Sequence, residues 1–210
     1  MSKLILISGG SCSGKTTFAK KICDKLNENN ISCNIIKMDS YYKDYPNQDL
    51  EWKLSNIDYD NPETCDINLL YFQLVNLVLK NKIIKSPIYD FKESKRSSFT
   101  NVIRPTEYVI LEGIWSMYFS NILEMATYKF FVMVDESYRY DRKYKRDIEQ
   151  RGRDANYVRH QWFNNVKPGH DKFVEYQKTL SDLIIPKGGD NIIGLEAVVR
   201  ILMKGEEHES

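Results

Sequence analysis

Residues 9–16 read Gly9-Gly10-Ser11-Cys12-Ser13-Gly14-Lys15-Thr16, which has the G-x-x-x-x-G-K-T spacing of a phosphate-binding P-loop. In such a loop the glycines allow the backbone to wrap closely, so that several N–H groups point inward at phosphate oxygens. This chemistry predicts that Lys15 reaches the β- and γ-phosphates of a nucleotide and that the Thr16 hydroxyl holds Mg²⁺. The alternative is a surface turn rich in glycine and serine.

The residues on both sides of the loop favour the phosphate site over the surface turn. Residues 4–8 belong to an apolar run of the buried parallel-strand type. After the loop, Phe18, Ile22 and Leu26 recur at helical spacing and predict a helix over residues 15–29. Because the N-terminus of a helix favours anions, the strand, loop and helix together predict a nucleotide-binding site.

Composition indicates an ordinary soluble protein. The chain has 210 residues, 42% hydrophobic and 28% charged, which predicts a single domain over residues 1–204 and a frayed polar tail at 205–210. A net charge of +1 argues against bulk attraction to nucleic acid or to a membrane. No apolar run approaches the ~20 residues of a membrane span, and the early strand leaves no room for a signal peptide, so we expect a cytoplasmic protein. The four cysteines form no CxxC pair, so neither zinc nor a disulfide framework is expected.

Alternating apolar patterns continue along the chain. Further strands are predicted at residues 33–38, 108–113, 129–135 and 182–186, and further helices at 66–80, 137–150, 154–165, 172–180 and 192–203. Two β-like runs, 82–89 and 97–104, predict a hairpin within residues 83–104 that covers the site, whereas residues 43–60 read as a polar loop. Strands alternating with helices predict an α/β three-layer sandwich of the P-loop NTPase type, with a mostly parallel sheet of about five strands.

Two carboxylates follow buried strands. Asp39 and Glu112 stand where predicted strands end, and ligands of open α/β sheets bind beyond the carboxyl ends of strands. We therefore expect Asp39 close to the phosphates, although its position also suits a helix N-cap or an Asx-turn. An acid such as Glu112, opposite a P-loop, usually holds Mg²⁺ or its water shell.

A basic helix follows the fourth predicted strand of the sheet. Arg139, Arg142, Arg146 and Arg153 are spaced to share one face, which is either a solvated face balanced by acids or a lid over a nucleotide. In the second case, the arginines of a lid at residues 139–156 would neutralise charge that develops during phosphoryl transfer. A nucleic-acid-binding role is weaker, because acids interrupt the patch and the whole chain is near neutral.

Several segments, taken in order, resemble the uridine kinase (uridine–cytidine kinase) family of P-loop kinases, from Lys3 to about Asn191. Besides the P-loop, the segments that carry the resemblance are Asp39-Ser40-Tyr41-Tyr42, Tyr59-Asp60-Asn61-Pro62, Pro87-Ile88-Tyr89-Asp90-Phe91, Glu112-Gly113-Ile114, Arg146-Asp147-Ile148-Glu149-Gln150-Arg151-Gly152-Arg153, Val166-Lys167-Pro168 and Ile184-Ile185-Pro186-Lys187-Gly188-Gly189-Asp190-Asn191. Each segment is weak alone, but their order and spacing together are specific.

The resemblance implies a kinase of pyrimidine salvage, which transfers the γ-phosphate of ATP or GTP to the 5′-hydroxyl of uridine or cytidine with Mg²⁺. It implies that Asp39 accepts the hydroxyl proton and that Asp60 binds the ribose 2′- and 3′-hydroxyls. The implied catalytic residues are Asp39, Lys15, Arg146 and Arg151, and the metal ligands are Thr16 and Glu112. The implied nucleotide-binding residues are Gly9, Gly10, Ser11, Cys12, Ser13, Gly14, Lys15, Thr16, Thr17, Arg151, Arg153 and Asp190. The implied acceptor-binding residues are Asp39, Tyr42, Asp60, Tyr89, Phe91, Ser94, Lys143 and Gln161. The family also forms tetramers, so a homotetramer is expected.

The chain departs from the family pattern mainly in the acceptor half. Ser94 stands where the family has a histidine that contacts the pyrimidine, Asn61 replaces a histidine, and Lys143 replaces an arginine. These changes leave open another small hydroxyl acceptor, such as a sugar phosphate or pantothenate. A non-catalytic nucleotide-binding module is a further alternative, although Asp39 followed by two tyrosines suits an acceptor pocket better than a switch.

Overall fold

The computed structural model describes residues 1–207, and its centre is a parallel sheet. Its five strands lie in the order β2-β5-β1-β6-β7, and neighbours pair in parallel. Their bounds are β1 (Lys3–Ser8), β2 (Cys33–Lys37), β5 (Tyr108–Glu112), β6 (Ala126–Val132) and β7 (Leu183–Ile185). This arrangement confirms the predicted α/β class and the five-stranded parallel sheet.

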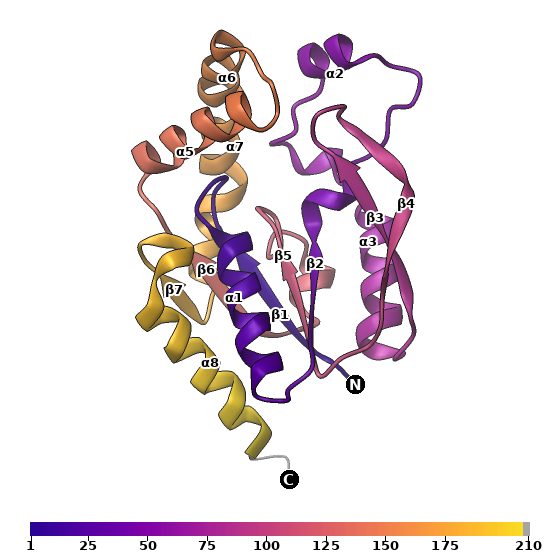
Figure 1. Ribbon diagram of the computed structural model, residues 1–210, viewed down its shortest axis with the longest axis vertical. Helices are drawn as coiled ribbons and strands as arrows, with labels where there is room; N and C mark the ends of the chain where they lie inside the picture. Colours follow the sequence, from indigo (N-terminus) through magenta and orange to yellow (C-terminus); the bar gives the residue numbers. More distant parts are fainter. Residues whose placement is uncertain (208–210) are drawn as a thin grey trace.

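Helices cover both faces of the sheet (Figure 1). On β1, Ile5 and Ile7 pack into a core with α1 (Lys15–Glu28) and α8 (Ile192–Glu207), whereas Leu4 and Leu6 pack into a second core with α3 (Ile67–Leu74). Side chains of a strand alternate between its faces, so a continuous apolar run is what a strand buried on both sides requires. The result is the predicted three-layer sandwich. Helix α8 extends to Glu207, beyond the predicted end at residue 203, and the rest of the predicted frayed tail, residues 208–210, lies outside the described residues.

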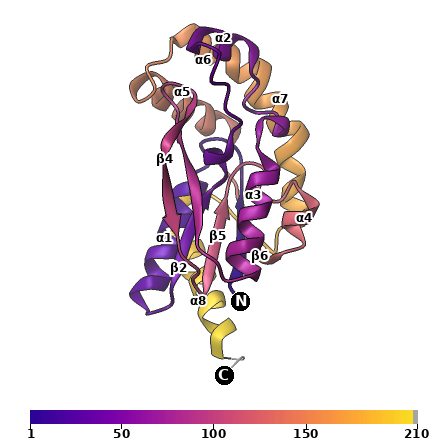
Figure 2. The same cartoon turned by 90° about the vertical axis from the view of Figure 1, so that its right-hand side faces the viewer.

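The predicted hairpin is present as a separate two-stranded antiparallel sheet, β3 (Ile84–Asp90) with β4 (Lys95–Ile103). Figure 2 shows it beside α3, with its turn reaching toward α5 (Glu136–Glu149). The P-loop, α5 and the hairpin turn therefore gather at the end of the molecule where the parallel strands finish (Figure 1).

Two predictions about the polar segments are wrong. Residues 43–60 are not all loop, because α2 (Leu50–Asn56) lies within them, with the Asp49 carboxylate accepting a hydrogen bond from the Trp52 amide at its N-cap. The separate helices predicted at 154–165 and 172–180 form one helical run, from α6 (Ala155–Gln161) through α7 (Lys167–Gly169) to Leu180. Several of its turns are π or 3₁₀, and such irregular turns accommodate Pro168 without ending the run.

Smaller differences concern element ends. Strand β6 occupies 126–132 rather than 129–135, and α4 (Ser120–Leu123) is a short helix that the apolar pattern does not reveal. None of the helices within residues 1–207 is long and apolar enough to cross a membrane.

Candidate active site

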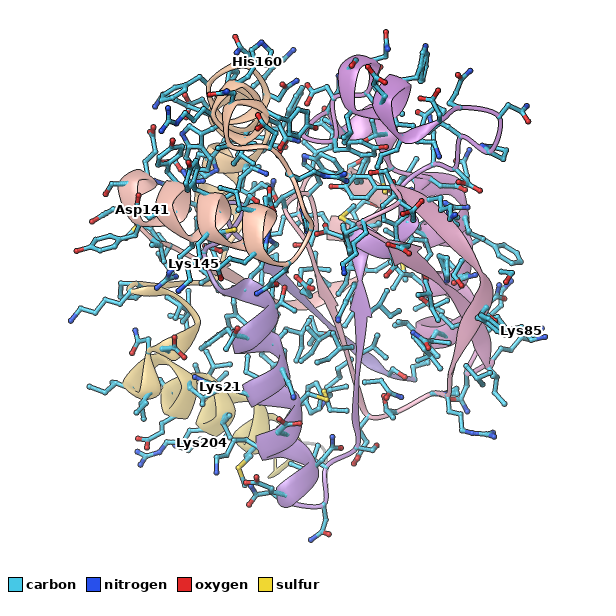
Figure 3. The ribbon with its side chains drawn as sticks, turned by 45° about the horizontal axis from the view of Figure 1, so that its top comes forward. Lys21, Lys85, Asp141, Lys145, His160 and Lys204 are labelled. Carbon is cyan, nitrogen blue, oxygen red and sulfur yellow. The ribbon has the colours of Figure 1, made fainter. Side chains whose placement is uncertain are left out.

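The P-loop connects β1 to α1 and rests on a second glycine-rich turn. Gly14 has a φ of 91°, and a Cβ there would lie 2.7 Å from the Gly189 nitrogen. A Cβ on Gly189 would lie 2.2 Å from the Gly14 carbonyl oxygen, so the two backbones can touch only because both residues are glycine. Lys21 on α1, labelled in Figure 3, holds this turn in place: its ammonium group donates hydrogen bonds to the Gly189 carbonyl at 3.2 Å and to the Asp190 carboxylate at 2.6 Å.

A cavity of about 520 Å³ lies over the P-loop and holds most of the site residues that the sequence predicted. Those that line it are Ser11, Cys12, Gly14, Lys15, Thr16, Thr17, Asp39, Tyr42, Asp60, Tyr89, Phe91, Ser94, Lys143, Arg146, Arg151, Arg153, Gln161 and Asp190. Gly9, Gly10, Ser13 and Glu112 do not form its wall. Residues that lie up to 179 positions apart in the chain, P-loop residues and aromatic residues among them, therefore meet in one space.

Glu112 lies behind the cavity wall at the end of β5, where its carboxylate accepts a 3.0 Å hydrogen bond from Thr16 Oγ1. Burial raises the pKa of Glu112 to about 7, since the nearby charge of Asp39 adds to the effect and that of Lys15 only partly offsets it. A neighbouring cation stabilises the ionised form of a buried acid of this kind. One hydroxyl and one carboxylate, completed by phosphate oxygens and water, form the oxygen donor set that Mg²⁺ takes. Thr16 and Glu112 therefore fit a magnesium ion.

Asp60 reaches the cavity from the loop before α3. Burial raises the pKa of Asp60 to about 6, the charge of Lys143 opposes this shift, and the charge of Asp39 adds to it. The run 155–180 passes directly beside Asp60, because a Cβ on Gly169 would lie 2.8 Å from the Asp60 carbonyl oxygen. Asp39 thus acts on both Glu112 and Asp60, which indicates that the three carboxylates share one site.

The basic helix α5 and the residues just after its end form a cluster of cations around Asp147, which we call the lid cluster: Lys143, Arg146 and Asp147 on the helix, and Arg151 beyond it. The Asp147 carboxylate lies 2.5 Å from Lys143 Nζ, 2.8 Å from Arg146 Nε and 3.2 Å from Arg151 Nη1. Burial opposes the ionisation of Asp147, but the three cations outweigh it and lower its pKa to about 2.

The lid cluster keeps an excess of positive charge toward the cavity, since three cations surround one carboxylate. Burial, and then the nearby charge of Arg146, lower the pKa of Arg151. Asp141 and Lys145 lie on the exposed part of the same helix (Figure 3). The basic helix therefore has a solvated outer face, as one interpretation of its sequence holds, and a cationic inner face, as the other holds. The inner face suits a polyanion such as a triphosphate.

The lid also contacts the hairpin turn. The Arg151 guanidinium lies 4.5 Å from the centre of the Phe91 ring. Arg153 Nη2 donates to the Phe91 carbonyl at 2.8 Å and to the Ser94 hydroxyl at 3.1 Å. The role of Arg153 in nucleotide binding stays a prediction, and its contacts lie at the aromatic side of the cavity rather than at the P-loop.

The cavity wall also contains residues to which the sequence analysis assigned no role in the site. They are Leu54, Tyr59, Ile114, Asp147, Gln150 and Tyr157, whereas Arg142, which was expected on the lid face, and Gly189, within a motif quoted above, also line the cavity. Leu54 lies on α2, within the segment interpreted as loop, so its pattern offered no signal. The motifs quoted above contain Tyr59, Ile114, Asp147 and Gln150, and those motifs were the signal that could have found these residues.

Comparisons with known proteins agree with this geometry. The model of the Phosphoribulokinase / Uridine kinase family matches residues 4–194. The chain is 40% identical to a uridine kinase of Alkaliphilus metalliredigens, over 92% of this chain and 91% of that one. It is 38% identical to a uridine kinase of Lactobacillus helveticus, over 92% and 90%. Among solved structures, D-glycerate 3-kinase of Cryptococcus neoformans aligns with a TM-score of 0.64 at 15% identity, over 91% of this chain and 88% of that one, which shows a shared fold.

Proposed function

Since the chain belongs to the phosphoribulokinase / uridine kinase family, we propose that it transfers the γ-phosphate of ATP or GTP to the 5′-hydroxyl of uridine or cytidine. One observation carries the proposal: a single cavity holds the P-loop residues Lys15 and Thr16 together with the acceptor carboxylates Asp39 and Asp60. Phosphoryl transfer requires chiefly that donor and acceptor be aligned and that charge be stabilised, and this cavity offers groups for both.

The donor triphosphate binds along the P-loop. The backbone N–H groups of the loop and the N-terminus of α1 hold the phosphates, and Lys15 contacts the β- and γ-phosphates. Thr16 and Glu112 are the residues that would hold Mg²⁺, and the ion would supply positive charge that neutralises part of the charge of the phosphates. Arg146 and Arg151 extend over the γ-phosphate, where charge develops as the bond to the leaving group breaks.

The acceptor nucleoside binds between the P-loop and the hairpin. Asp39 accepts the proton of the attacking 5′-hydroxyl, which needs only a carboxylate at hydrogen-bonding distance. Asp60 accepts hydrogen bonds from the 2′- and 3′-hydroxyls of the ribose. The enzyme consequently rejects a 2′-deoxyribonucleoside, because losing one hydroxyl leaves a buried acceptor without a partner. The cytoplasmic location and the homotetramer stay predictions from the sequence.

The decisive test is a coupled assay of ADP release with Mg-ATP across uridine, cytidine, 2′-deoxyuridine, adenosine and pantothenate. We expect release with uridine and cytidine and little with the other acceptors. Asp39→Asn should lower turnover with uridine at least ~100-fold while leaving ATP affinity unchanged. The matched control is Asp24→Asn, which alters an exposed acid on α1. Release driven by pantothenate but not by uridine would refute the proposal, and ATP binding without transfer to any acceptor would indicate a binding module instead.

A further inference from the structure

Two phenol hydroxyls in the wall of the cavity lack hydrogen-bond partners. The hydroxyl oxygens of Tyr59 and Tyr89 are buried and lie close to each other and to the Ser94 hydroxyl, but neither makes a hydrogen bond of normal geometry within the part of the chain that the structure describes. Both tyrosines line the cavity next to Ser94. A buried hydroxyl without a partner is unfavourable, because it has lost its bonds to water and gained none in return. A buried hydroxyl that lacks a partner in the wall of a ligand cavity indicates a polar group of the ligand that completes its hydrogen bonding.

The two rings are held firmly. Tyr42 contacts both rings edge-on, at 5.3 Å from the Tyr59 centroid and 5.4 Å from the Tyr89 centroid. The Tyr42 hydroxyl also donates to the Tyr59 carbonyl at 3.0 Å. Ser94 is buried at the turn of the hairpin with a φ of 48°, and its hydroxyl accepts the bond from Arg153. Tyr59 therefore cannot satisfy its hydroxyl by swinging toward solvent.

The place proposed for Tyr59 follows from that of its neighbour Asp60. It precedes Asp60, which the proposed function assigns to the ribose, and both side chains line the same cavity. The turn that holds them is fixed by Asp58, whose carboxylate accepts from the Asp60 amide at 3.0 Å and whose carbonyl accepts from the Asn61 amide at 3.0 Å. One short segment thus presents a carboxylate for the sugar and a neighbouring hydroxyl for the group attached to the sugar.

A phenol suits both pyrimidines. Burial raises the pKa of Tyr59, so its hydroxyl stays protonated and can both donate and accept. Uracil carries a carbonyl oxygen at position 4, which accepts, and cytosine carries an amino group there, which donates. A hydroxyl pairs with either by rotating its hydrogen, whereas a carboxylate would suit only the amino group.

We propose, on the basis of the proposed function, that Tyr59 is a specificity-determining residue whose hydroxyl forms a hydrogen bond with the 4-substituent of the pyrimidine base. Tyr89 and Ser94 complete the polar patch around this contact. Tyr59 acts on substrate binding and takes no part in moving the proton or the phosphate.

The test compares three acceptors with the wild-type enzyme and Tyr59→Phe. The acceptors are uridine, cytidine and the ribonucleoside of pyrimidin-2-one, which lacks a 4-substituent. We expect Tyr59→Phe to lower kcat/KM about 10-fold for uridine and for cytidine, mainly through KM, as for a lost hydrogen bond. It should leave kcat/KM for the pyrimidin-2-one ribonucleoside unchanged. The matched control is Tyr128→Phe, which removes a phenol hydroxyl on β6, outside the cavity wall.

Equal effects of Tyr59→Phe on all three acceptors, or no effect on any, would overturn this inference and leave the proposed function standing. A wild-type enzyme inactive with all three would instead overturn the proposed function. ATP affinity measured by calorimetry reports whether the variant is folded. If Tyr59→Phe fails to bind ATP, the inference is tested with the wild-type enzyme alone, by comparing kcat/KM for uridine with kcat/KM for the pyrimidin-2-one ribonucleoside. Equal values would contradict a contact between the enzyme and the 4-substituent.

Discussion

Replacing Asp147 by asparagine removes the carboxylate at the centre of the lid cluster while preserving the size of the side chain. Asp147 is 2% exposed and contacts Lys143, Arg146 and Arg151 within 3.2 Å. An amide carries no charge, so the substitution leaves three cations close together without their counter-ion. A buried charge that loses its partner is costly, and we expect a clear loss of stability.

The size of the loss follows from the pKa of Asp147, which its surroundings lower from 3.8 to about 2. Because each pKa unit corresponds to about 1.4 kcal/mol, ionised Asp147 stabilises the folded protein by about 2 kcal/mol at pH 7. The cations left unpaired increase the loss, since breaking a buried ion pair typically costs about 3–5 kcal/mol. Asp147→Asn should therefore lower the free energy of unfolding by about 2–5 kcal/mol.

The pH dependence has a definite sign. A carboxylate with a lower pKa in the folded state stabilises fully above its unfolded pKa and loses this effect as the pH falls through its folded pKa. The difference between wild type and Asp147→Asn should thus be constant from pH 7 to pH 5. Below pH 4 the difference in the free energy of unfolding between the two proteins should become smaller. At pH 3 the ionised carboxylate of Asp147 contributes about 1 kcal/mol.

Urea unfolding followed by tryptophan fluorescence measures these energies, because Trp115 and Trp162 are each 1% exposed in the folded protein. The control is Asp141→Asn, which alters an exposed acid on the same helix (Figure 3) and should change stability by less than about 0.5 kcal/mol. If Asp147→Asn proves as stable as this control at pH 7, Asp147 is not the counter-ion of the lid cluster.

Three further substitutions test the site. Lys15→Ala should abolish phosphoryl transfer, because the β- and γ-phosphates lose their main point charge; near-normal turnover would remove the P-loop from the mechanism. Asp60 has a pKa of about 6, so kcat/KM for uridine should fall about 10-fold from pH 8 to pH 5 as its carboxylate takes up a proton. Asp60→Asn should make this fall in kcat/KM smaller, because only the Asp60 contribution is lost while Glu112, whose pKa burial raises to about 7, still titrates. It should also weaken uridine binding more than ATP binding, whereas equal losses for both ligands would make Asp60 structural. Arg96 donates to the carbonyls of Tyr41 at 3.3 Å and Tyr42 at 2.9 Å, which follow the proposed catalytic base. Arg96→Ala should therefore lower kcat with little change in ATP affinity, and an unchanged kcat would show that the base needs no such support.

The fold was predictable where short-range patterns are strong. A continuous apolar run, as in residues 4–8, can be buried on both faces only in the middle of a sheet, and helical spacing in α1 and α3 is equally distinctive. The prediction failed where local and long-range forces compete. The gap between the helices predicted at 154–165 and 172–180 contains Pro168 and Gly169, but the helical run continues through it with π and 3₁₀ turns, and Gly169 lies against Asp60. Helix α2 is short and mostly polar, so its sequence resembles that of a loop.

The sequence by itself determined which chemistry the chain can perform, because the spacing of a P-loop, the acids after strands and the arginines of α5 are local properties. Only the tertiary structure decided how these groups act on one another. Arg153 contacts Ser94 across 59 positions, and Asp147 becomes the counter-ion of its neighbours because Asp147 and Lys143 are buried together with two partly exposed arginines against them. The hydroxyls of Tyr59 and of Tyr89 on the hairpin come into one cavity wall only in the folded chain. Interaction energies depend on distances and burial, and both are set by contacts between residues far apart in the chain.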